Sequence, residues 1–537
     1  MKPNSDKTRL STLLQGAALL GAAVASAQSQ ALEYKYDEWN FNVDTTLGYS
    51  AQWRTENRDG FLEAAPNAND GDNNFDKGNM TSSKANIILE LGGDRGEFSF
   101  FIRGDAMYDY IYEDVTSDMS KQNYLTYNDG IPVGGDVERG DYPDGTLDKH
   151  GKRVRLLDAF AKYNFLLGDY DGSVKAGRQI ISWGGSLFYP GINGLQNPND
   201  AAAALAPGVE TKEIFLPTEA IDLKGTITDS ISVEAYYKLG WKETLQPGVG
   251  SYLSGTDYFG PGAQRILLGP LGSGKSDGSN TPGDSDQWGV ALRYMFESGW
   301  NTELAYAESH ANIPGAFTFI DLTGPGSYIE EIYAEDIPAV NFSVSGNISE
   351  AEVYADVFYS DDMPFADISE ELVVDGSSVA LIRSRVVRDD YWQVTVGMSD
   401  LYTAFKWLSP SIAFNAEVLY QGNNLGDNDL QGTPYVVTDD AWGYQFALTP
   451  RYFNIIQGMD GTLSLAFRHD VQGYGNAIAL GNGLEEDQKK ASITATGIYL
   501  SNWEVKATYA WFWDEKEEGD YLIKDRDNVS LSLKYRF

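Results

Sequence analysis

Apolar and polar residues alternate without a break over the last nine positions of the chain. The run reads Val529-Ser530-Leu531-Ser532-Leu533-Lys534-Tyr535-Arg536-Phe537. Successive side chains of a β-strand point to opposite faces, so this run predicts one apolar face and one polar face. The same alternation recurs at 98–109, 233–241, 288–296, 412–421 and 503–513.

These runs are each about 9–11 residues long, which is the span of a tilted strand in a bilayer. An open sheet in lipid would leave backbone groups without hydrogen-bond partners, so such strands can cross a membrane only as a closed barrel. The expected fold class is therefore all-β, a transmembrane antiparallel β-barrel over residues 41–537.

Short and long connections alternate along the chain, which sets the number of strands. Eight short turns are expected at 92–97, 168–172, 228–230, 297–299, 345–349, 408–410, 456–460 and 501–502. Nine long polar segments are expected at 54–83, 113–152, 183–219, 242–286, 311–338, 360–390, 422–441, 471–489 and 514–527. This alternation predicts about 16–18 strands, an even number as outer-membrane barrels require.

The segment 183–219 is unusually apolar for a surface loop and contains four prolines. The lumen of a barrel of this size is too wide for wall side chains to fill. We therefore expect the segment to fold inward as a constriction, because a long apolar loop is poorly suited to lie in water. The alternative is an outer loop packed on its neighbours.

The N-terminus predicts export. Lys2, Lys7 and Arg9 precede the apolar stretch 10–24, and Ala25-Ser26-Ala27 follows it. This pattern predicts a signal peptide over residues 1–27 and a periplasmic segment over 28–40. The terminal Phe537 resembles the last residue of bacterial outer-membrane barrels. The expected location is the outer membrane, in contact with its lipid and lipopolysaccharide.

Composition narrows the chemistry. The chain has no cysteine, which excludes disulfides and thiolate metal sites, and its net charge of −38 argues against nucleic acid as a partner. An Asp/Asn-rich stretch loosely resembles a calcium loop, although Lys77 and Ser83 stand where Gly and Glu are usual. Structural calcium and a plain polar turn both remain open there; the candidate ligands are Asp70, Asp72, Asn74 and Asp76.

Two patterns that suggest an enzyme do not hold. Residues 269–276 match a phosphate-binding loop, but the residues at 277–284 cannot begin the helix that such a loop requires. The chain has three histidines, His150, His310 and His469, and none lies in a motif that suggests a triad. No enzymatic activity and no cofactor other than calcium are expected.

Several separated motifs resemble one protein family. They include Gly177-Arg178-Gln179, Ser182-Trp183-Gly184, Gly191-Ile192-Asn193, Pro207-Gly208-Val209-Glu210 and Asp525-Arg526-Asp527. Together they are similar to the proteobacterial outer-membrane family catalogued as domain of unknown function thirteen-oh-two. The family usually carries an acidic residue after Trp-Gly, where this chain has Gly185.

The resemblance implies a barrel that works with a periplasmic lipid-carrier-like protein and an inner-membrane permease of the resistance-nodulation-division (RND) type. The expected function is a conduit for a hydrophobic or amphipathic, lipid-like small molecule. A general or substrate-specific porin for hydrophilic solutes, and a surface-interaction protein acting through acidic loops, are the alternatives.

The expected substrate path combines the constriction with inward-facing charges. Arg178 would orient a polar group of the substrate. The apolar part would contact the residues Trp183, Leu187, Phe188, Tyr189, Ile192 and Phe215. Arg103 and Asp105 alternate with apolar residues and should face the lumen. The alternative is that such charges only pair across the barrel wall.

Overall fold

The computed structural model describes residues 32–65, 67–115, 141–201, 214–268, 273–324, 326–367, 371–375, 378–403, 405, 407–425, 437–475, 477–481, 483–514 and 522–537. The predicted signal peptide, residues 28–31 and the part of the expected constriction at 202–213 lie outside this set.

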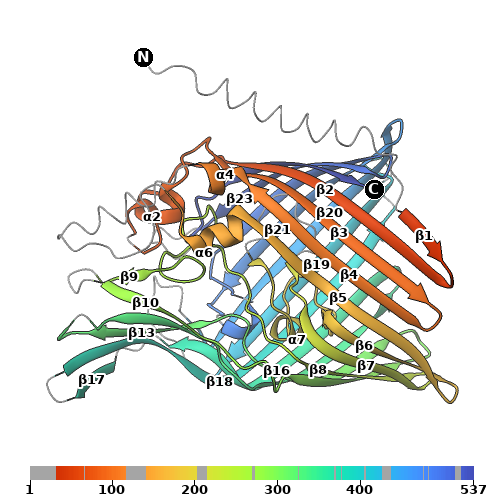
Figure 1. Cartoon of the computed structure of the whole chain (residues 1–537), viewed down its shortest axis with the longest axis horizontal. Coiled ribbons are helices and arrows are strands. Elements are labelled where there is room, and N and C mark those ends of the chain that lie inside the picture. Colours follow the sequence, from red (N-terminus) through yellow and green to blue (C-terminus); the bar gives the residue numbers. More distant parts are fainter. Residues whose placement is uncertain are drawn as a thin grey trace.

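Eighteen strands form a closed antiparallel barrel, which confirms the expected fold class (Figure 1). Each strand pairs with the next in chain order, and β24 pairs with β2 to close the ring. The barrel strands are β2 (Trp39–Arg54), β3 (Met80–Arg95), β4 (Phe98–Asp109), β5 (Lys152–Leu167), β6 (Tyr170–Gln179), β7 (Thr218–Thr228), β8 (Ile231–Lys238), β11 (Trp288–Met295), β12 (Asn301–Ser309), β15 (Ile337–Ile348), β16 (Ala351–Asp367), β18 (Ser378–Tyr402), β19 (Ser411–Asn423), β20 (Asp440–Ile456), β21 (Met459–Gln472), β22 (Lys489–Tyr499), β23 (Trp503–Trp513) and β24 (Asn528–Arg536).

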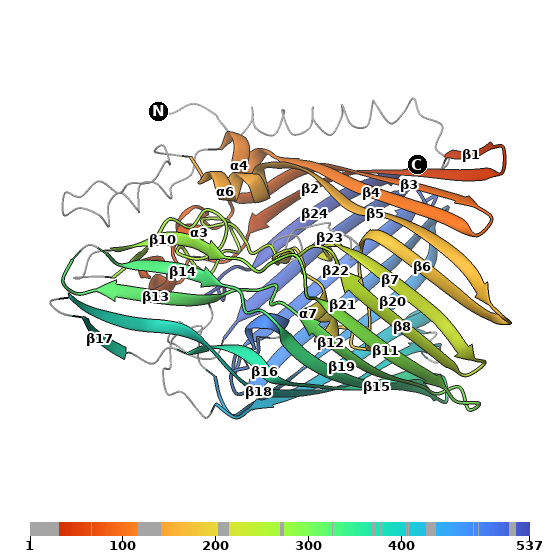
Figure 2. The same ribbon diagram turned by 60° about the horizontal axis from the view of Figure 1, so that its bottom comes forward.

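A second, smaller sheet extends from the long-loop end of the barrel (Figure 2). It is built on the first residues of β18, with β10 and β14 running parallel to each other. Its other strands are β9 (Arg265–Leu267), β10 (Ser273–Asn280), β13 (Gly315–Asp321), β14 (Tyr328–Ile332) and β17 (Glu371–Asp375). A further strand, β1 (Leu32–Tyr36), pairs with β2 near the opposite rim.

The described helices are all short. They are α2 (Gly60–Ala64), α3 (Asp70–Asn73), α4 (Tyr110–Asp114), α6 (Asp144–Thr146), α7 (Ile192–Gln196), η1 (Leu147–Gly151) and η3 (Ile478–Leu480). Within the described ranges, no helix has the length and apolar character needed to cross a membrane.

All eight expected short turns lie between consecutive strands at one rim of the barrel. The left-handed residues that tight reversals need are present there, for example Gly168 (φ +66°) between β5 and β6 and Gly458 (φ +81°) between β20 and β21. The long segments connect strands at the opposite rim, so the predicted alternation of connections is correct.

The exposure of side chains is inverted relative to a water-soluble protein. Large apolar residues on the outer face are the exposed ones, such as Val154 on β5, which is 85% exposed. Charged residues of the opposite parity are buried, such as Glu417 on β19, which is 1% exposed. An apolar exterior around a polar interior is the arrangement that a membrane-spanning barrel requires.

Candidate functional site: a loop pinned inside the barrel

The connection between β6 and β7 folds into the lumen. Its described parts, residues 180–201 and 214–217, contact inward-facing side chains of β5, β8, β12, β16 and β19. These strands lie on different sides of the barrel, so the segment crosses the interior. We call the described part of this connection the plug.

Glu417 of β19 binds three consecutive backbone amides of the plug. The N–H of Leu187 donates to Oε2 at 2.7 Å, and those of Phe188 and Tyr189 donate to Oε1 at 3.1 and 2.7 Å. The hydroxyl of Tyr354 on β16 also donates to Oε2. Successive N–H groups that converge in this way form an anion nest, here filled by a wall carboxylate.

Two further carboxylates hold the preceding turn of the plug. The N–H of Gly184 donates to Oε1 of Glu303 on β12 at 2.9 Å. The N–H of Gly185 and the hydroxyl of Ser186 donate to Asp356 on β16 at 3.1 and 2.8 Å. Gly184 has φ +77°, a left-handed conformation that glycine adopts without strain.

The structure gives a reason for glycine at position 185, where the resemblance implies an acidic residue. A Cβ atom at this position would lie 3.3 Å from Cβ of Tyr354. A carboxylate there would also approach Asp356, which already binds the Gly185 amide. In this chain the acidic group near the Trp-Gly pair is therefore supplied by the barrel wall.

Basic side chains hold the second half of the plug. Asp200 accepts from Arg153 at 2.9 Å and from Arg155, both on β5. The ammonium of Lys238 on β8 donates to the carbonyl of Gln196, at the end of α7. The plug is thus fixed by polar contacts at both ends of its first described part.

The middle of the plug packs into an apolar cluster inside the lumen. Trp183, Ile192 and Leu195 are at most 1% exposed. A second inward loop, between β21 and β22, brings η3 against the same cluster, and Leu480 of η3 is also buried. The other members from the described residues include Ile181, Tyr236, Ile337, Phe358, Met363, Phe365, Tyr391 and Val437.

The structure divides the predicted apolar residues into two groups. Trp183, Tyr189 and Ile192 are each 1% exposed and serve to pack the plug. Leu187 is 55% exposed, and Phe188 and Phe215 are partly buried. A role in a substrate path remains a prediction, and the second group is the one with surface available for contact.

The expected position of Arg178 needs correction. Arg178 pairs directly with Glu219 across β6 and β7, at 3.1 Å between Nε and Oε1. In that register Glu219 has the same parity as Ile221 and Leu223, which are 43% and 49% exposed on the outer face. Arg178 therefore lies on the outside of the wall, where it cannot orient a substrate in the lumen.

Arg103 and Asp105 face the lumen as predicted, but both are engaged. Arg103 pairs with Asp158 at 2.7 Å, and Asp105 pairs with Arg155 at 2.6 Å. The four groups lie on neighbouring strands β4 and β5. The alternative interpretation, that such charges pair across the wall, describes these two residues.

A cavity of about 410 Å³ lies beneath the plug at the short-turn rim. Gly184 and Gly185 line one side of it, and the β7–β8 turn at 228–230 lines another. Arg293 of β11 also borders the cavity, and it bridges Glu234 and Glu303 at 2.6 Å each. We call this cavity the chamber.

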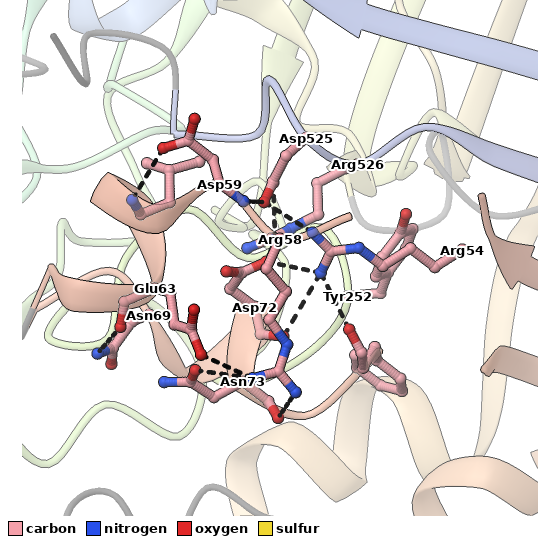
Figure 3. A network of polar contacts seen from close by, with 12 residues as sticks. Arg54, Arg58, Asp59, Glu63, Asn69, Asp72, Asn73, Tyr252, Asp525 and Arg526 are labelled. Atoms are coloured by element: carbon pink, nitrogen blue, oxygen red, sulfur yellow. Dashed lines mark hydrogen bonds and ion pairs between the residues drawn. The ribbon is translucent and has the colours of Figure 1, made fainter. Parts of the chain in front are cut away.

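A buried cluster of four charges lies at the long-loop rim (Figure 3). Arg54, at the end of β2, binds Asp72 at 2.6 Å and Asp525 at 2.7 Å. Arg526 binds the same two carboxylates, and all four side chains are at most 4% exposed. Both guanidinium groups lie about 6 Å from the ring of Tyr252. We call this cluster the clamp.

The clamp explains the acidic stretch that suggested calcium. Asp72 faces two guanidinium groups, and Asp76 pairs with Arg58 at 2.7 Å. Asn74 donates to the carbonyl of Gly250 at 2.8 Å. In the described parts of the chain, no group of three or more acidic or histidine side chains is arranged to hold a metal. Of the four candidate ligands, Asp72 and Asp76 are therefore already bound by arginines, and structural calcium at this stretch stays a prediction.

The predicted site residues did not include Glu303, Asp356 or Glu417. Each occurs as an isolated acidic residue at an inward position of an alternating strand. That signal was available, but parity alone does not distinguish an acid that binds a loop from one that pairs with a neighbouring strand.

A family model described as protein of unknown function (DUF1302) matches residues 12–537. The chain belongs to this family. The family description carries no activity, and no functionally curated protein matches the sequence.

Several solved structures match over most of their length at low sequence identity. OccAB4 of Acinetobacter baumannii has 9% identity and a TM-score of 0.44, and the match covers 95% of this chain and 100% of that one. OmpF of Salmonella typhi has 11% identity and a TM-score of 0.36, with coverage of 94% and 100%. OpdK of Pseudomonas aeruginosa has 8% identity and a TM-score of 0.40, with coverage of 92% and 98%.

Proposed function

We propose that this protein is an outer-membrane channel for a hydrophobic or amphipathic, lipid-like small molecule, and that the plug closes it at rest. The observation that carries the proposal is the apolar cluster inside the lumen. A water-filled porin has a polar interior. Here two inward loops bury Trp183, Ile192, Leu195 and Leu480 in the path between the two rims.

The proposal includes partners on the periplasmic side. A lipid-like cargo is poorly soluble in water, so a periplasmic lipid-carrier-like protein and an RND-type permease would have to deliver it. The barrel itself would lie among outer-membrane lipid and lipopolysaccharide. We assign it no catalytic role.

A substrate-specific porin for hydrophilic solutes is the second candidate. The inward charges on β4, β5, β11 and β12 favour it, because rings of mixed charge set the selectivity of polar pores. The third candidate, a surface-interaction protein acting through its acidic loops, would keep its function in a barrel that conducts nothing.

The chain offers a direct test because it contains no native cysteine. A Cβ at Gly191 would lie 3.7 Å from Cβ of Phe358 on β16, close to the mean separation in a disulfide of about 3.8 Å. The Gly191→Cys/Phe358→Cys variant should therefore lock the plug to the wall when oxidised. The matching open variant replaces residues 184–216 with a short Gly-Ser linker, which can span the gap because β6 and β7 are neighbours.

Single-channel conductance in planar bilayers distinguishes the candidates. We expect the oxidised double-cysteine variant and the wild type to be nearly silent, and the linker variant to conduct. The two single-cysteine variants are the controls for the loss of Gly191 or Phe358. Large, steady conductance in the wild type that survives oxidation of the double variant would reject the plugged conduit in favour of a porin.

A further inference from the structure

The chamber beneath the plug has the size and polarity of a ligand site. Its volume of about 410 Å³ lies within the range of small-molecule pockets, about 300–1,000 Å³. It borders the short β7–β8 and β11–β12 turns. Short turns mark the periplasmic rim of an outer-membrane barrel, so the chamber is at the periplasmic side of the plug.

The groups that line the chamber are mostly neutral hydrogen-bonding side chains. Those with inward parity include Thr226, Ser232, Asn301, Ser343 and Ser345. Ile231, Met295 and the ring of Tyr354 supply apolar surface. Hydroxyl and amide groups beside apolar surface suit a ligand that has one polar end and an apolar body.

The charge of the chamber argues against an anion. The charged residues that line it are Arg293, Glu303 and Asp229, so its lining has a net negative charge; the other partner of Arg293, Glu234, is also paired with Lys224 at 3.0 Å. Nη2 of Arg293 has no hydrogen-bond partner among the described residues, and the side chain is 32% exposed. A neutral oxygen acceptor could bind that free N–H group without bringing a second negative charge.

Two chamber residues also hold the carboxylates that anchor the plug. Arg293 binds Glu303, which accepts the Gly184 amide. Tyr354 donates to Glu417, which accepts the amides of residues 187–189. A ligand that contacts Arg293 and Tyr354 would therefore change the positions of the groups that fix the plug.

We infer that the chamber binds a small neutral molecule carrying a hydroxyl or carbonyl group on an apolar body, and that this molecule arrives from the periplasmic side. Binding weakens the plug anchors through Arg293 and Tyr354. The arrival of this molecule from the periplasmic side rests on the proposed channel function, whereas its binding to the chamber does not.

Protection of an introduced thiol tests the inference. Ser232→Cys places the single cysteine of the chain in the chamber, and a membrane-impermeant maleimide is added to one side of a bilayer at a time. We expect reaction from the short-turn side. Benzyl alcohol should slow it several-fold, whereas benzoate, which differs mainly by its negative charge, should leave the rate unchanged.

Thr508→Cys is the matched control, because Thr508 faces inward on β23 and does not border the chamber. Its reaction should not respond to either compound. Equal slowing at both cysteines, equal slowing by both compounds, or no slowing at Ser232→Cys would overturn the inference.

A second pair of variants assigns the contact to Arg293. In the Ser232→Cys background, Arg293→Met should abolish protection by benzyl alcohol, and Arg293→Lys should retain part of it. If the methionine variant does not fold, the lysine variant alone provides the test. Full protection of that variant by benzyl alcohol, at the same concentrations as in the parent, would show that Arg293 does not contact the ligand. An always-open wild-type channel would reject the proposed function while these protection rates still report on binding.

Discussion

The plug and the clamp both fix a loop against the barrel wall with buried carboxylates, but the donors differ. At residues 184–189 of the plug, Glu303, Asp356 and Glu417 accept hydrogen bonds from neutral backbone amides and a hydroxyl. In the clamp, Asp72 and Asp525 each bind two guanidinium groups.

This difference bears on which region can move. Amides released from a carboxylate can turn to water or to a ligand, and the cost is that of ordinary hydrogen bonds. Separating a buried ion pair leaves uncompensated charges in a dry site, which is far more costly. Residues 184–189 of the plug are thus the part that can be released at the lower cost, whereas the clamp and the ion pairs of Asp200 with Arg153 and Arg155 should stay in place.

The largest expected effect is the loss of one clamp arginine. Arg526→Met leaves Asp72 and Asp525 with a single cation between them, and we expect a loss of about 3–5 kcal/mol in the free energy of unfolding. Urea unfolding of the barrel in lipid vesicles measures it. Arg58→Met, in the β2–β3 loop that carries Asp72, is the control, because Arg58 pairs with the exposed residues Glu63 and Asp76 and should contribute less than about 1 kcal/mol. Equal effects of the two variants would contradict the assignment of the clamp.

Removing a plug anchor should have a smaller effect on stability but a direct effect on conduction. Glu417→Ala removes the acceptor of three amides. It should lower the free energy of unfolding by only roughly 2–3 kcal/mol, because the freed amides can partly bind water. We expect channel openings in a bilayer and faster hydrogen exchange at residues 187–189. Glu417→Gln retains one carbonyl acceptor and should lie between the alanine variant and the wild type. A silent Glu417→Ala channel would mean that the apolar cluster alone holds the plug.

Acid should destabilise the protein through His150. Burial lowers the pKa of this imidazole to about 3, with a further contribution from Arg153, which also binds the plug residue Asp200. The unfolded chain binds a proton near pH 6.5 and the folded chain does not, so stability is lost as the pH falls from about 6.5 toward 3. At about pH 5.5 the expected loss is about 1.4 kcal/mol.

The His150→Gln variant isolates this contribution. In the wild type, the N–H of Gly248 donates to Nε2 of His150 at 2.9 Å. The side-chain oxygen of glutamine can still accept this hydrogen bond. The comparison with wild type is needed because burial, together with the neighbouring Asp70, raises the pKa of Asp257, and that carboxyl stabilises the fold as the pH falls. When the pH falls from about 7.5 to about 5.5, urea unfolding should show a loss of stability about 1.4 kcal/mol larger in the wild type than in the variant. An equal loss of stability in acid for the variant and the wild type would show that groups other than His150 cause it.

The smallest effect is expected at Arg178. Its partner Glu219 is 41% exposed, so Arg178→Gln should change stability by less than about 1 kcal/mol and leave conduction unchanged. Arg155→Gln is the matched inward variant, because Arg155 binds both Asp105 and the plug residue Asp200. Altered conduction in Arg178→Gln alone would restore the role that the sequence suggested for it.

The barrel was predictable because its signal is local and repeated. In each strand, the alternation of apolar and polar residues predicts which side chains face outward and which face the lumen. Tight turns need residues such as Gly168 and Gly458. The outward orientation of Arg178 also follows from strand parity. Val174 and Ala176 have the same parity as Arg178 on β6, and they pair with the outward residues Leu223 and Ile221. The family motif drew attention to Arg178, although its parity pointed outward.

The plug was predictable as an apolar loop, but its anchors were not. Glu303, Asp356 and Glu417 contact it across 119 to 230 positions of sequence. The acidic stretch around Asp72 suggested calcium for the same reason, because one of the two arginines that Asp72 binds, Arg526, lies 454 positions away in the sequence. Only closure of the barrel brings such groups together.

The location of the clamp has a consequence for the order of assembly. Arg54 ends β2 and Asp525-Arg526 precede β24, and these are the two strands whose pairing closes the ring. At the other end of the same seam, the backbone groups of Thr45 and Phe537 bond to each other at 2.8 and 3.0 Å. The four charges can meet only once β2 and β24 pair at this end of the seam, so formation of the clamp requires that the barrel close there. An intact clamp is therefore a marker of a closed ring, which an open sheet of the same strands would lack.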